Sequence, residues 1–524
     1  MTTTFLRSAL AAFALVAITA PAAGAFEVRG RFLYEDRLYD GNGYTGTVQN
    51  LPIRRTKVEL VNAATQTVLA TGTTGADGRY LLTATSAIPV NLYVRSITDG
   101  RPAGYQMRVV DNFVRVPTVG LNLTGSQLYS ISTATTVAHN PVNNLDLGDY
   151  LIQDLDGFGV AQAFNIFDNG VDFFDWLAQP GLNGALPTAA QFLVFAWKAT
   201  GTPGNPPPQF GSNYSQQGVF IGADPTADTD GWSDTVILHE TGHWLDDVFA
   251  RSDNPGGAHF IGDNDANVLL AFGEGMATFH CAKVREWRSA RPNLVGQPID
   301  RLVSLYADLE LPPPVGTPGA LSFAYDFETG NFANTGLPIG QRGSANETNV
   351  TSALWDMMDG IASPDATPGA DDDALEASDS EAWQIEVPYI LALSTANPLT
   401  VEDFYQGWFA TKGAGFAQAA MNGIFVTLAR MPFAADALEP DGSTAAARPV
   451  TPVPYGVSPS GKVVINDLDL GAADAIELMN TSDVAVDMEG WQIEVYANGT
   501  QQDASRIYTF PPFTLQPGEC VALH

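Results

Sequence analysis

The stretch Asp234–His243 constrains this chain more than any other, because it specifies a helix and a metal site together. It reads D-T-V-I-L-H-E-T-G-H, and its second half matches the pattern H-E-x-x-H. Histidines four residues apart lie on one face of a helix, so the rings of His239 and His243 can reach one metal ion. Glu240 follows the first histidine and can hydrogen-bond a water at that metal. The pattern predicts a zinc-activated hydrolytic site, and the alternative is a surface helix that carries these residues by chance.

A catalytic zinc site needs a third protein ligand and one position left for water. No histidine follows His243 at the spacing H-x-x-G-x-x-H, because the chain continues W-L-D-D-V-F. A second amphipathic helix, predicted over residues 265–287, carries Glu274 between Gly273 and Gly275. A glycine inside a helix costs about 1 kcal/mol relative to alanine, so two of them need a reason. Close approach to the motif helix is such a reason, and a ligating Glu274 requires it.

The pattern H-E-x-x-H, followed on the next helix by G-E-G-x-A, resembles the gluzincins. In this group of zincins, a Glu on the second helix completes a His₂Glu zinc site. The resemblance covers roughly residues 155–435 and implies a mainly helical α+β catalytic domain. It also implies that His239, His243 and Glu274 bind Zn²⁺ and that Glu240 is the general base.

The residues around this site depart from the family pattern. Thermolysin-like gluzincins have an Asp four residues after the ligand Glu, and it braces the first zinc-binding His. Thr278 occupies that position here, so the surroundings of the metal differ. Asp246 or Asp247, one turn after His243, is the expected substitute.

The resemblance further implies a His or Tyr that stabilises the transition state. His259, in G-G-A-H-F between the two predicted helices, is the first candidate for this catalytic role. Tyr325, in F-A-Y-D-F, is the second. His280 lies on roughly the opposite face of its helix from Glu274, so it is expected to be structural.

Acidic residues crowd the approach to the motif helix, namely Asp224, Asp228, Asp230 and Asp234. Such carboxylates can chelate Ca²⁺, which is one interpretation of the cluster. D-T-D-G lacks the rest of an EF-hand loop, however. We favour helix capping, with Ser233 as the N-cap and Asp234 in the first turn. By resemblance to zincins, Gly218–Gly222 is expected to be an edge strand that pairs with an extended substrate.

Residues 1–25 are typical of a secretory signal peptide. Arg7 precedes the short apolar core Ser8–Ala20, and small residues follow at 23–25, which predicts cleavage before Phe26. The apolar core is short for a membrane anchor, and no other segment is predicted to span a bilayer. The mature protein is therefore expected to be secreted and extracellular.

Residues 26–150 alternate between apolar and polar positions, with Gly, Asn and Asp at the turns, as in a β-sandwich. P-I-R-R-T-K-V-E-L-V, then T-V-L-A-T-G-T-T-G-A-D-G-R-Y-L-L, resembles the carboxypeptidase-regulatory-like, transthyretin-type domain. That resemblance covers roughly residues 26–122 and implies a non-catalytic accessory module.

The rest of the chain divides at a Pro-rich linker over residues 436–461, which separates a zincin-like domain at 151–435 from residues 462–524. The last segment resembles the lamin-tail domain, an Ig-like β-sandwich, through Ile476-Glu477-Leu478, Asn480, Gly490-Trp491 and Pro517-Gly518. That family normally has further strands, so this copy is expected to be short or truncated. The resemblance implies an accessory or attachment module.

The charge balance excludes some partners. Lys and Arg number 25 against 58 Asp and Glu, a net charge of −33, which repels nucleic acid and anionic membranes. The two cysteines, Cys281 and Cys520, predict neither a disulfide framework nor a cysteine metal site.

These features together predict a secreted zinc metallopeptidase that acts on proteins or peptides. Two alternatives remain open. One is a non-catalytic surface adhesion or scaffold protein with a degenerate zincin domain. The other is a zinc hydrolase of another amide or ester.

Overall fold

The structure is a computed structural model, and the chain divides into two compact units, Met1–Met431 and Pro432–His524. In the first unit it describes residues 24–40, 43–112, 114–116, 120–153, 160–197, 211–215, 218–224, 228–257, 259, 267–289, 303–307, 322–326, 331–332, 343–358, 375–395, 398–429 and 431. In the second it describes 463–469, 475–480, 485–488, 492–495, 506–509, 513–516 and 520–523. The predicted signal peptide lies outside the described residues up to position 23.

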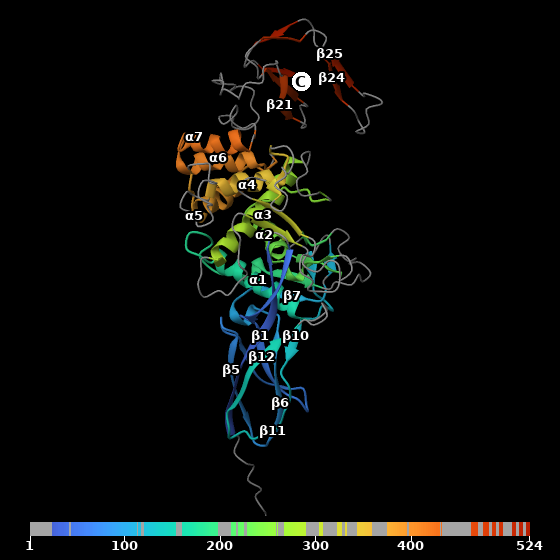
Figure 1. Cartoon of the computed structure of the whole chain (residues 1–524), viewed down its shortest axis with the longest axis vertical. Coiled ribbons are helices and arrows are strands. Elements are labelled where there is room, and N and C mark those ends of the chain that lie inside the picture. The colour runs from blue at the N-terminus through green and yellow to red at the C-terminus, as the bar shows by residue number, and fades with distance from the viewer. Residues whose placement is uncertain are drawn as a thin grey trace, which may run out of the picture. The chain divides into compact units, whose positions relative to one another are not determined.

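Two β-sheets make up the N-terminal part of the first unit (Figure 1). One contains β1 (Gly24–Asp40), β2 (Gly43–Pro52), β5 (Arg79–Ser86) and β12 (Leu145–Ile152). The other contains β3 (Lys57–Asn62), β4 (Val68–Thr73), β6 (Val90–Ile97), β10 (Ser130–Ser132) and β11 (Thr136–His139). The strand β1 is central to its sheet, since it pairs with β2 and β5 in antiparallel and with β12 in parallel.

Alternation of apolar and polar residues drives the packing of this part. Along β5, every second side chain is buried, as a strand with one face toward a core requires. Side chains from both sheets share one core, among them Phe32 of β1, Leu60 of β3 and Val94 of β6, all fully buried. The predicted N-terminal β-rich region is thus confirmed, while its likeness to the carboxypeptidase-regulatory family stays a prediction.

A third sheet links the N-terminal strands to the central region. Its order is β14 (Asn213–Ser215), β15 (Gly218–Ile221), β13 (Leu193–Trp197) and β7 (Met107–Val110). The prediction that the segment at 218–222 is an edge strand is wrong, because β15 lies between β13 and β14. The edge strands are β14 and β7. The strand β7 precedes the predicted domain boundary near residue 150, yet it pairs with β13 beyond it.

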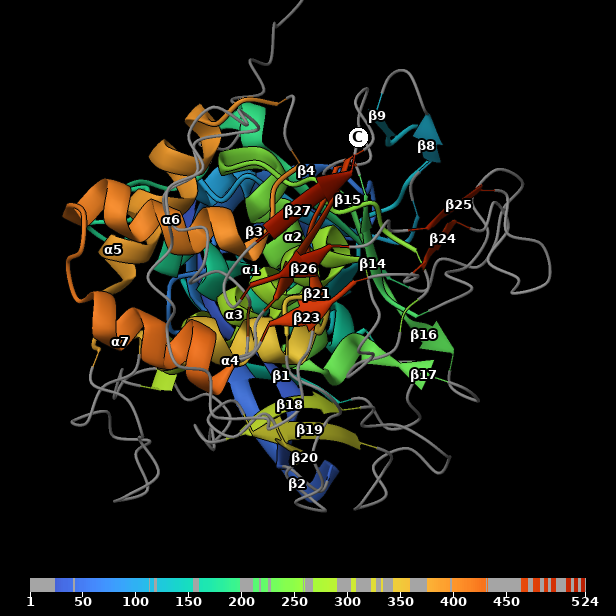
Figure 2. The same cartoon turned by 90° about the horizontal axis from the view of Figure 1, so that it is seen from above.

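The central region is rich in helices, as predicted. Its main helices are α1 (Ala161–Leu177), α2 (Asp234–Phe249), α3 (Val268–Ser289), α4 (Glu347–Met358), α5 (Asp379–Gln384), α6 (Val401–Lys412) and α7 (Gln418–Asn422). Two π-helical segments, η4 (Ile385–Ile390) and η5 (Gly423–Leu428), continue α5 and α7. Helices α1, α2 and α3 lie between the N-terminal strands and α4 to α7 (Figure 1), and α5, α6 and α7 gather on one side of α3 (Figure 2).

Short elements complete the first unit. They are η1 (Arg101–Ala103), β8 (Val114–Val116), β9 (Gly120–Asn122), η2 (Ala189–Gln191), β16 (Ala223–Asp224), β17 (Asp228–Thr229), η3 (Asp230–Trp232), β18 (Val303–Ala307), β19 (Ser322–Asp326) and β20 (Asn331–Phe332). The strands β18, β19 and β20 form a separate antiparallel sheet.

A buried ionic cluster joins the N-terminal strands to three helices. Arg54, just after β2, places Nε 2.6 Å from Asp168 Oδ1 and Nη2 2.8 Å from Asp172 Oδ1, both on α1. Arg288 of α3 lies 2.6 Å from Asp172 Oδ2 and donates to Asp234 Oδ2 at the start of α2, also at 2.6 Å. All five side chains are buried. Buried charges are tolerated only when paired in this way, so the cluster holds α1, α2 and α3 in register.

The second unit contains only strands among its described residues. One sheet has the order β21 (Val463–Asp469), β22 (Ala475–Asn480) and β27 (Cys520–Leu523), and two ribbons pair β23 (Val486–Asp487) with β26 (Thr514–Leu515) and β24 (Gln492–Val495) with β25 (Arg506–Thr509). Leu478, Met488 and Leu515 form its apolar core. Asn480 is fully buried and donates through Nδ2 to Leu515 O at 2.9 Å, which ties two of these strand pairs together.

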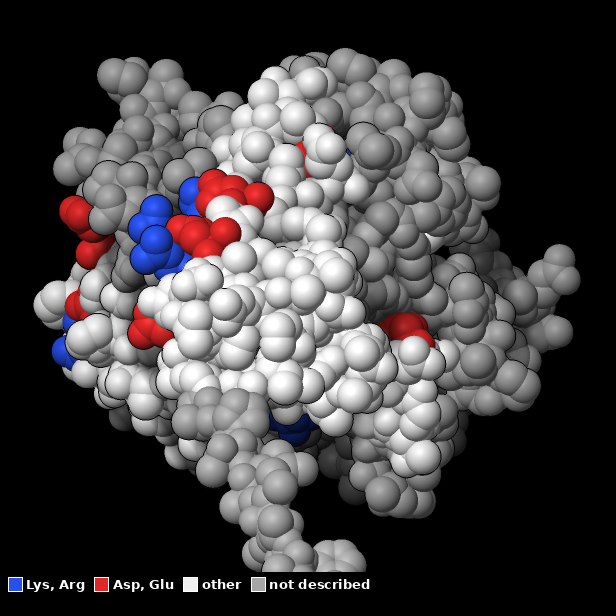
Figure 3. All heavy atoms as spheres, turned by 90° about the horizontal axis from the view of Figure 1, so that it is seen from below, with Lys and Arg blue, Asp and Glu red and all other residues white. Residues whose placement is uncertain are grey.

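Charged side chains lie on the surface of the N-terminal part of the first unit (Figure 3). Figure 3 looks onto the end of the N-terminal strands, where acidic and basic side chains lie together in one patch. Exposed pairs such as Arg29 with Asp146, whose Nε and Oδ2 are 3.0 Å apart, belong to this part and contribute little stability.

Cys281 of α3 is a buried free thiol, and burial raises its pKa to about 12. Among the described helices, none has the length and apolarity needed to cross a membrane.

Candidate metal centre

Helix α2 begins where the sequence predicts. Ser233 is the N-cap, and its Oγ accepts from the Val236 amide at 3.4 Å. Asp234 follows in the first turn, where the positive end of the helix dipole stabilises a carboxylate. Its carboxylate accepts from Asn169 at 2.7 Å as well as from Arg288.

That pairing argues against the calcium interpretation of the acidic approach. The oxygens of Asp234 are taken by an amide and a guanidinium, and Asp230 accepts from Ser212 at 2.6 Å. The side chains of Asp224 and Asp228 lie outside the described residues. None of the metal-competent groups found in the described part of the chain includes these aspartates.

Gly242, inside the motif, allows α2 and α3 to touch. A Cβ at this position would lie 2.7 Å from Ala277 O and 2.8 Å from Ala277 Cα, closer than real contacts allow. The prediction that Gly273 and Gly275 serve this approach is wrong. A Cβ at Gly273 would meet the Asn254 side chain at 2.7 Å, and one at Gly275 would meet Val350 of α4 at 2.6 Å.

The close approach brings the three predicted ligands together. Oε2 of Glu274 lies 3.2 Å from Nε2 of His239 and 3.2 Å from Nε2 of His243. The ligand atoms of all three residues lie within 4.8 Å of one another. The two imidazole rings are almost perpendicular, at 88°, with centroids 4.8 Å apart. Two nitrogens and one carboxylate oxygen therefore converge on one point, an arrangement that suits zinc.

Thr278 braces the first histidine at the position where thermolysin-like gluzincins have an Asp. Its Oγ1 lies 2.9 Å from Nδ1 of His239, which directs Nε2 of the ring toward Glu274. Neither predicted substitute has this role. Asp246 contacts His280 at 3.1 Å, and Asp247 accepts from the Tyr214 hydroxyl at 2.6 Å. A threonine hydroxyl, unlike a carboxylate, adds no negative charge beside the site.

Asn254, which the sequence interpretation missed, holds Glu274, the predicted third ligand. Its Nδ2 donates to Oε1 at 3.0 Å and leaves Oε2 to face the histidines. Gly273 makes room for it, as described above. Gly273, just before Glu274, indicated in the sequence that another group lies close to this helix. The spacing of residues could not show that this group is Asn254, which lies in a loop twenty residues earlier.

His259 also reaches the site, whereas Tyr325 is not placed. Nε2 of His259 lies 3.5 Å from Glu274 Oε2 and 3.4 Å from Glu347 Oε2, at the start of α4. It groups with these two carboxylates rather than with the two motif histidines. The backbone of Tyr325 belongs to β19, and its side chain lies outside the described residues.

The charges of the site shift its pKa values strongly. Burial alone would raise the pKa of Glu274, but the surrounding histidines, His243 first, hold it well below its usual range. Burial opposes ionisation of His243, yet Glu274 raises its pKa to about 9. The contact with Glu274 raises the pKa of His259 to about 10. A metal ion bound at Glu274 would therefore have to displace protons from the histidines that ligate it.

Glu240, the predicted general base, is 4% exposed on the same helix. Burial raises its pKa, and the charge of Glu274 adds to this, whereas His239 and His243 oppose it. A raised carboxylate pKa moves the group toward the range in which proton transfer is efficient.

Replacing Thr278 by Val is expected to weaken zinc binding by roughly 10- to 100-fold, because His239 loses the partner that orients its ring. Thr278→Ser retains the hydroxyl and should bind zinc as the wild type does. Competition with a chromophoric chelator measures both. Equal affinities for the Val variant and the wild type would show that the hydroxyl does not orient the ligand.

Comparisons with known proteins identify one part of the chain. Residues 457–524 match the family Lamin Tail Domain, which confirms the prediction for the C-terminal unit and its Ig-like fold class. No curated protein matches the chain. Among solved structures, a 9R-lipoxygenase from Cyanothece is 14% identical over 34% of this chain and 28% of its own, with a TM-score of 0.16. A likeness of that size carries no argument about fold or function.

Proposed function

We propose that this protein is an exported, zinc-dependent metallopeptidase. One observation carries the proposal, namely the convergence of His239, His243 and Glu274 beside a buried Glu240 on the motif helix. The resemblance of these two motifs to the gluzincins supports the same assignment. Export rests on the sequence of residues 1–25 alone.

The donor atoms fit zinc in kind and in spacing. Ligands about 2.1 Å from a tetrahedral metal lie ~3.4 Å apart, and the observed separations from Glu274 Oε2 are 3.2 Å. The Nδ1 contact of His239 with Thr278 presents Nε2 to the site, which is how ligating histidines are usually oriented. Zinc held there would supply Lewis-acid activation of water and of the scissile carbonyl.

The chain's own groups would handle the protons and the developing charge. Glu240 takes a proton from the attacking water and returns it to the leaving amine. His259, half-buried between Glu274 and Glu347, would donate a hydrogen bond to an oxyanion. Zinc held by His239, His243 and Glu274 alone would keep a fourth position for water.

Two other functions compete with this proposal. The lamin tail domain favours a role in attachment, so the protein could be a scaffold whose metal centre does not turn over. The same centre could also hydrolyse a different amide or an ester. Substrate and turnover separate these three functions, and metal binding alone does not.

Cleavage of a peptide library by the purified full-length protein is expected to stop when 1,10-phenanthroline removes the metal. Cleavage should return when Zn²⁺, but not Mg²⁺ or Ca²⁺, is added back, because the site offers imidazole nitrogens that the harder cations bind poorly. Zinc-loaded protein that cleaves no peptide would contradict the proposal. Hydrolysis of esters without peptides would select the second alternative, and no hydrolysis at all would select the scaffold.

A further inference from the structure

A second cluster of potential metal ligands lies one to two turns beyond the first on α2 and α3. Asp246 of α2 follows His243 by three residues, and His280 of α3 follows Glu274 by six. Glu386 of η4 completes the group. Their ligand atoms lie within 4.8 Å of one another, and the three residues are 5%, 1% and 3% exposed. The cluster is separate from the residues proposed for hydrolysis.

The contacts within this cluster are incomplete without a cation. Nε2 of His280 lies 3.1 Å from Asp246 Oδ1 and 2.9 Å from Glu386 Oε1. One N–H shared between two carboxylates satisfies neither fully, and its contact with Glu386 Oε1 lacks the alignment of a good hydrogen bond. Two buried carboxylates therefore face one imidazole nitrogen. One imidazolium balances only one of two buried carboxylate charges, so a further cation would stabilise the cluster.

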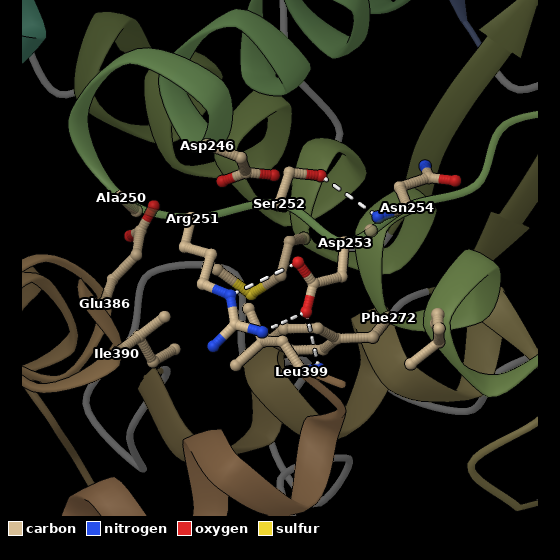
Figure 4. A pocket seen from close by; sticks show the side chains of 13 residues that line it. Asp246, Ala250, Arg251, Ser252, Asp253, Asn254, Phe272, Glu386, Ile390 and Leu399 are labelled. Atoms are coloured by element: carbon tan, nitrogen blue, oxygen red, sulfur yellow. Dashed lines mark hydrogen bonds and ion pairs between the residues drawn. The ribbon is translucent and has the colours of Figure 1, made fainter. Parts of the chain in front are cut away.

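Space for a further ligand lies beside the two carboxylates. A small cavity of about 10 Å³ is lined by Asp246 and Glu386, together with Arg251, Asp253 and Asn254 among others. In Figure 4 the two carboxylates lie at one end of it, while Arg251 is held by Asp253. That volume is about the smallest that holds one water, which could complete a four-coordinate metal.

We propose that Asp246, His280 and Glu386 bind a second divalent metal ion, with Zn²⁺ as the best match. One imidazole nitrogen with two carboxylate oxygens is a ligand set that zinc accepts and that Ca²⁺, which takes only oxygens, does not prefer. The separations of 2.9 and 3.1 Å are close to the ~3.4 Å between ligands of a tetrahedral zinc. The ion balances the two carboxylates and crosslinks α2, α3 and η4.

Glu386 lies in a π-helical turn, which supports a specific role for its carboxylate. The π-helix Ile385–Ile390 contains Pro388 and follows α5 directly. Such turns widen a helix by one residue and recur at functional sites. Here the turn brings Glu386 toward Asp246 and His280, which come from two other helices.

The test measures zinc per chain in a protein that lacks the first site. Full-length protein with His239→Asn and His243→Asn, loaded with Zn²⁺ and desalted, is expected to retain one zinc by mass spectrometry of the metal. Adding Glu386→Gln, which keeps the size of the side chain and removes its charge, should release that zinc. It should also abolish the rise in melting temperature that Zn²⁺ causes. Glu376→Gln, an exposed carboxylate ten residues earlier, is the matched control and should change neither value.

Two results would overturn the proposal. One is a folded double variant, by circular dichroism, that retains no zinc. The other is equal zinc content with and without Glu386→Gln. Should the double variant fail to fold, the same comparison is made in the wild-type background, where Glu386→Gln must lower the zinc content by one per chain. Loss of peptide cleavage plays no part in this readout, so failure of the proposed peptidase activity leaves the test intact.

Discussion

Glu240→Gln is expected to abolish most peptide hydrolysis while the protein keeps its zinc at the motif. The amide has the size of the carboxylate but cannot take a proton from water. General-base catalysis typically contributes roughly 10²- to 10⁴-fold, so kcat should fall by that factor. Glu240 touches none of the ligand atoms through a described hydrogen bond, and the zinc content should therefore stay at the wild-type level. A fluorogenic peptide gives kcat, and metal analysis gives zinc.

Asp247→Asn is the matched control for this variant. Asp247 is an exposed carboxylate on the same helix, and it contacts Tyr214 rather than the site. Its variant should keep kcat within about twofold, since surface changes away from the site have small effects. A Glu240→Gln protein with more than a tenth of wild-type kcat would mean that another group is the base.

Gly242→Ala is expected to destabilise the first unit and to weaken zinc binding together. The new methyl group would lie 2.7 to 2.8 Å from the backbone of Ala277, which cannot move without shifting α3. Overpacking of this kind typically lowers the free energy of unfolding by about 1–3 kcal/mol. At Gly242 the new methyl group would meet backbone atoms, which relax less easily than a side chain. Because Ala277 precedes Thr278 and lies one turn after Glu274, a shift of α3 displaces the ligand and the brace. Urea unfolding and chelator competition measure the two effects.

Gly423→Ala provides the comparison. This glycine also lies within a helical segment, but a Cβ there meets nothing within 4 Å. Alanine has the higher helix propensity, by up to about 1 kcal/mol, so the variant should be as stable as the wild type or more stable. Equal stability of both alanine variants would show that α2 and α3 are not in tight contact at Gly242.

Local patterns predicted much of the candidate site. The cap at Ser233, the helix that follows it and the pairing of His239 with His243 depend on residues within a few turns, so they could be read directly. Glu274 was predictable because its helix comes next in the chain. The contact of Thr278 with His239 was not predictable. A hydroxyl in place of a carboxylate suggested that another residue orients the His239 ring. Only the distance from Nδ1 of His239 to Oγ1 of Thr278 shows that Thr278 keeps this role.

Long-range partners explain the other differences. The strand β15 was predicted at its correct position in the chain. Its place between β13 and β14 was not predicted, because the sequence pattern of a strand does not show which other strands pair with it. The buried polar side chains of α1 could not be predicted, since Asp168 and Asp172 find Arg54 and Arg288 more than a hundred residues away. Neither partner can be inferred from helical spacing.

The buried ionic cluster also bears on how parts of this chain could be exchanged. Arg54 comes from the N-terminal strand region, whereas Asp168 and Asp172 belong to α1, which packs against α2 and α3. A recombination event that kept the helices but replaced those strands would leave Asp168 buried without its cation and Asp172 with Arg288 alone, at a cost of about 3–5 kcal/mol. The lamin tail domain belongs to a separate compact unit. The buried ion pairs lead us to expect that the N-terminal strands are inherited together with helices α1, α2 and α3.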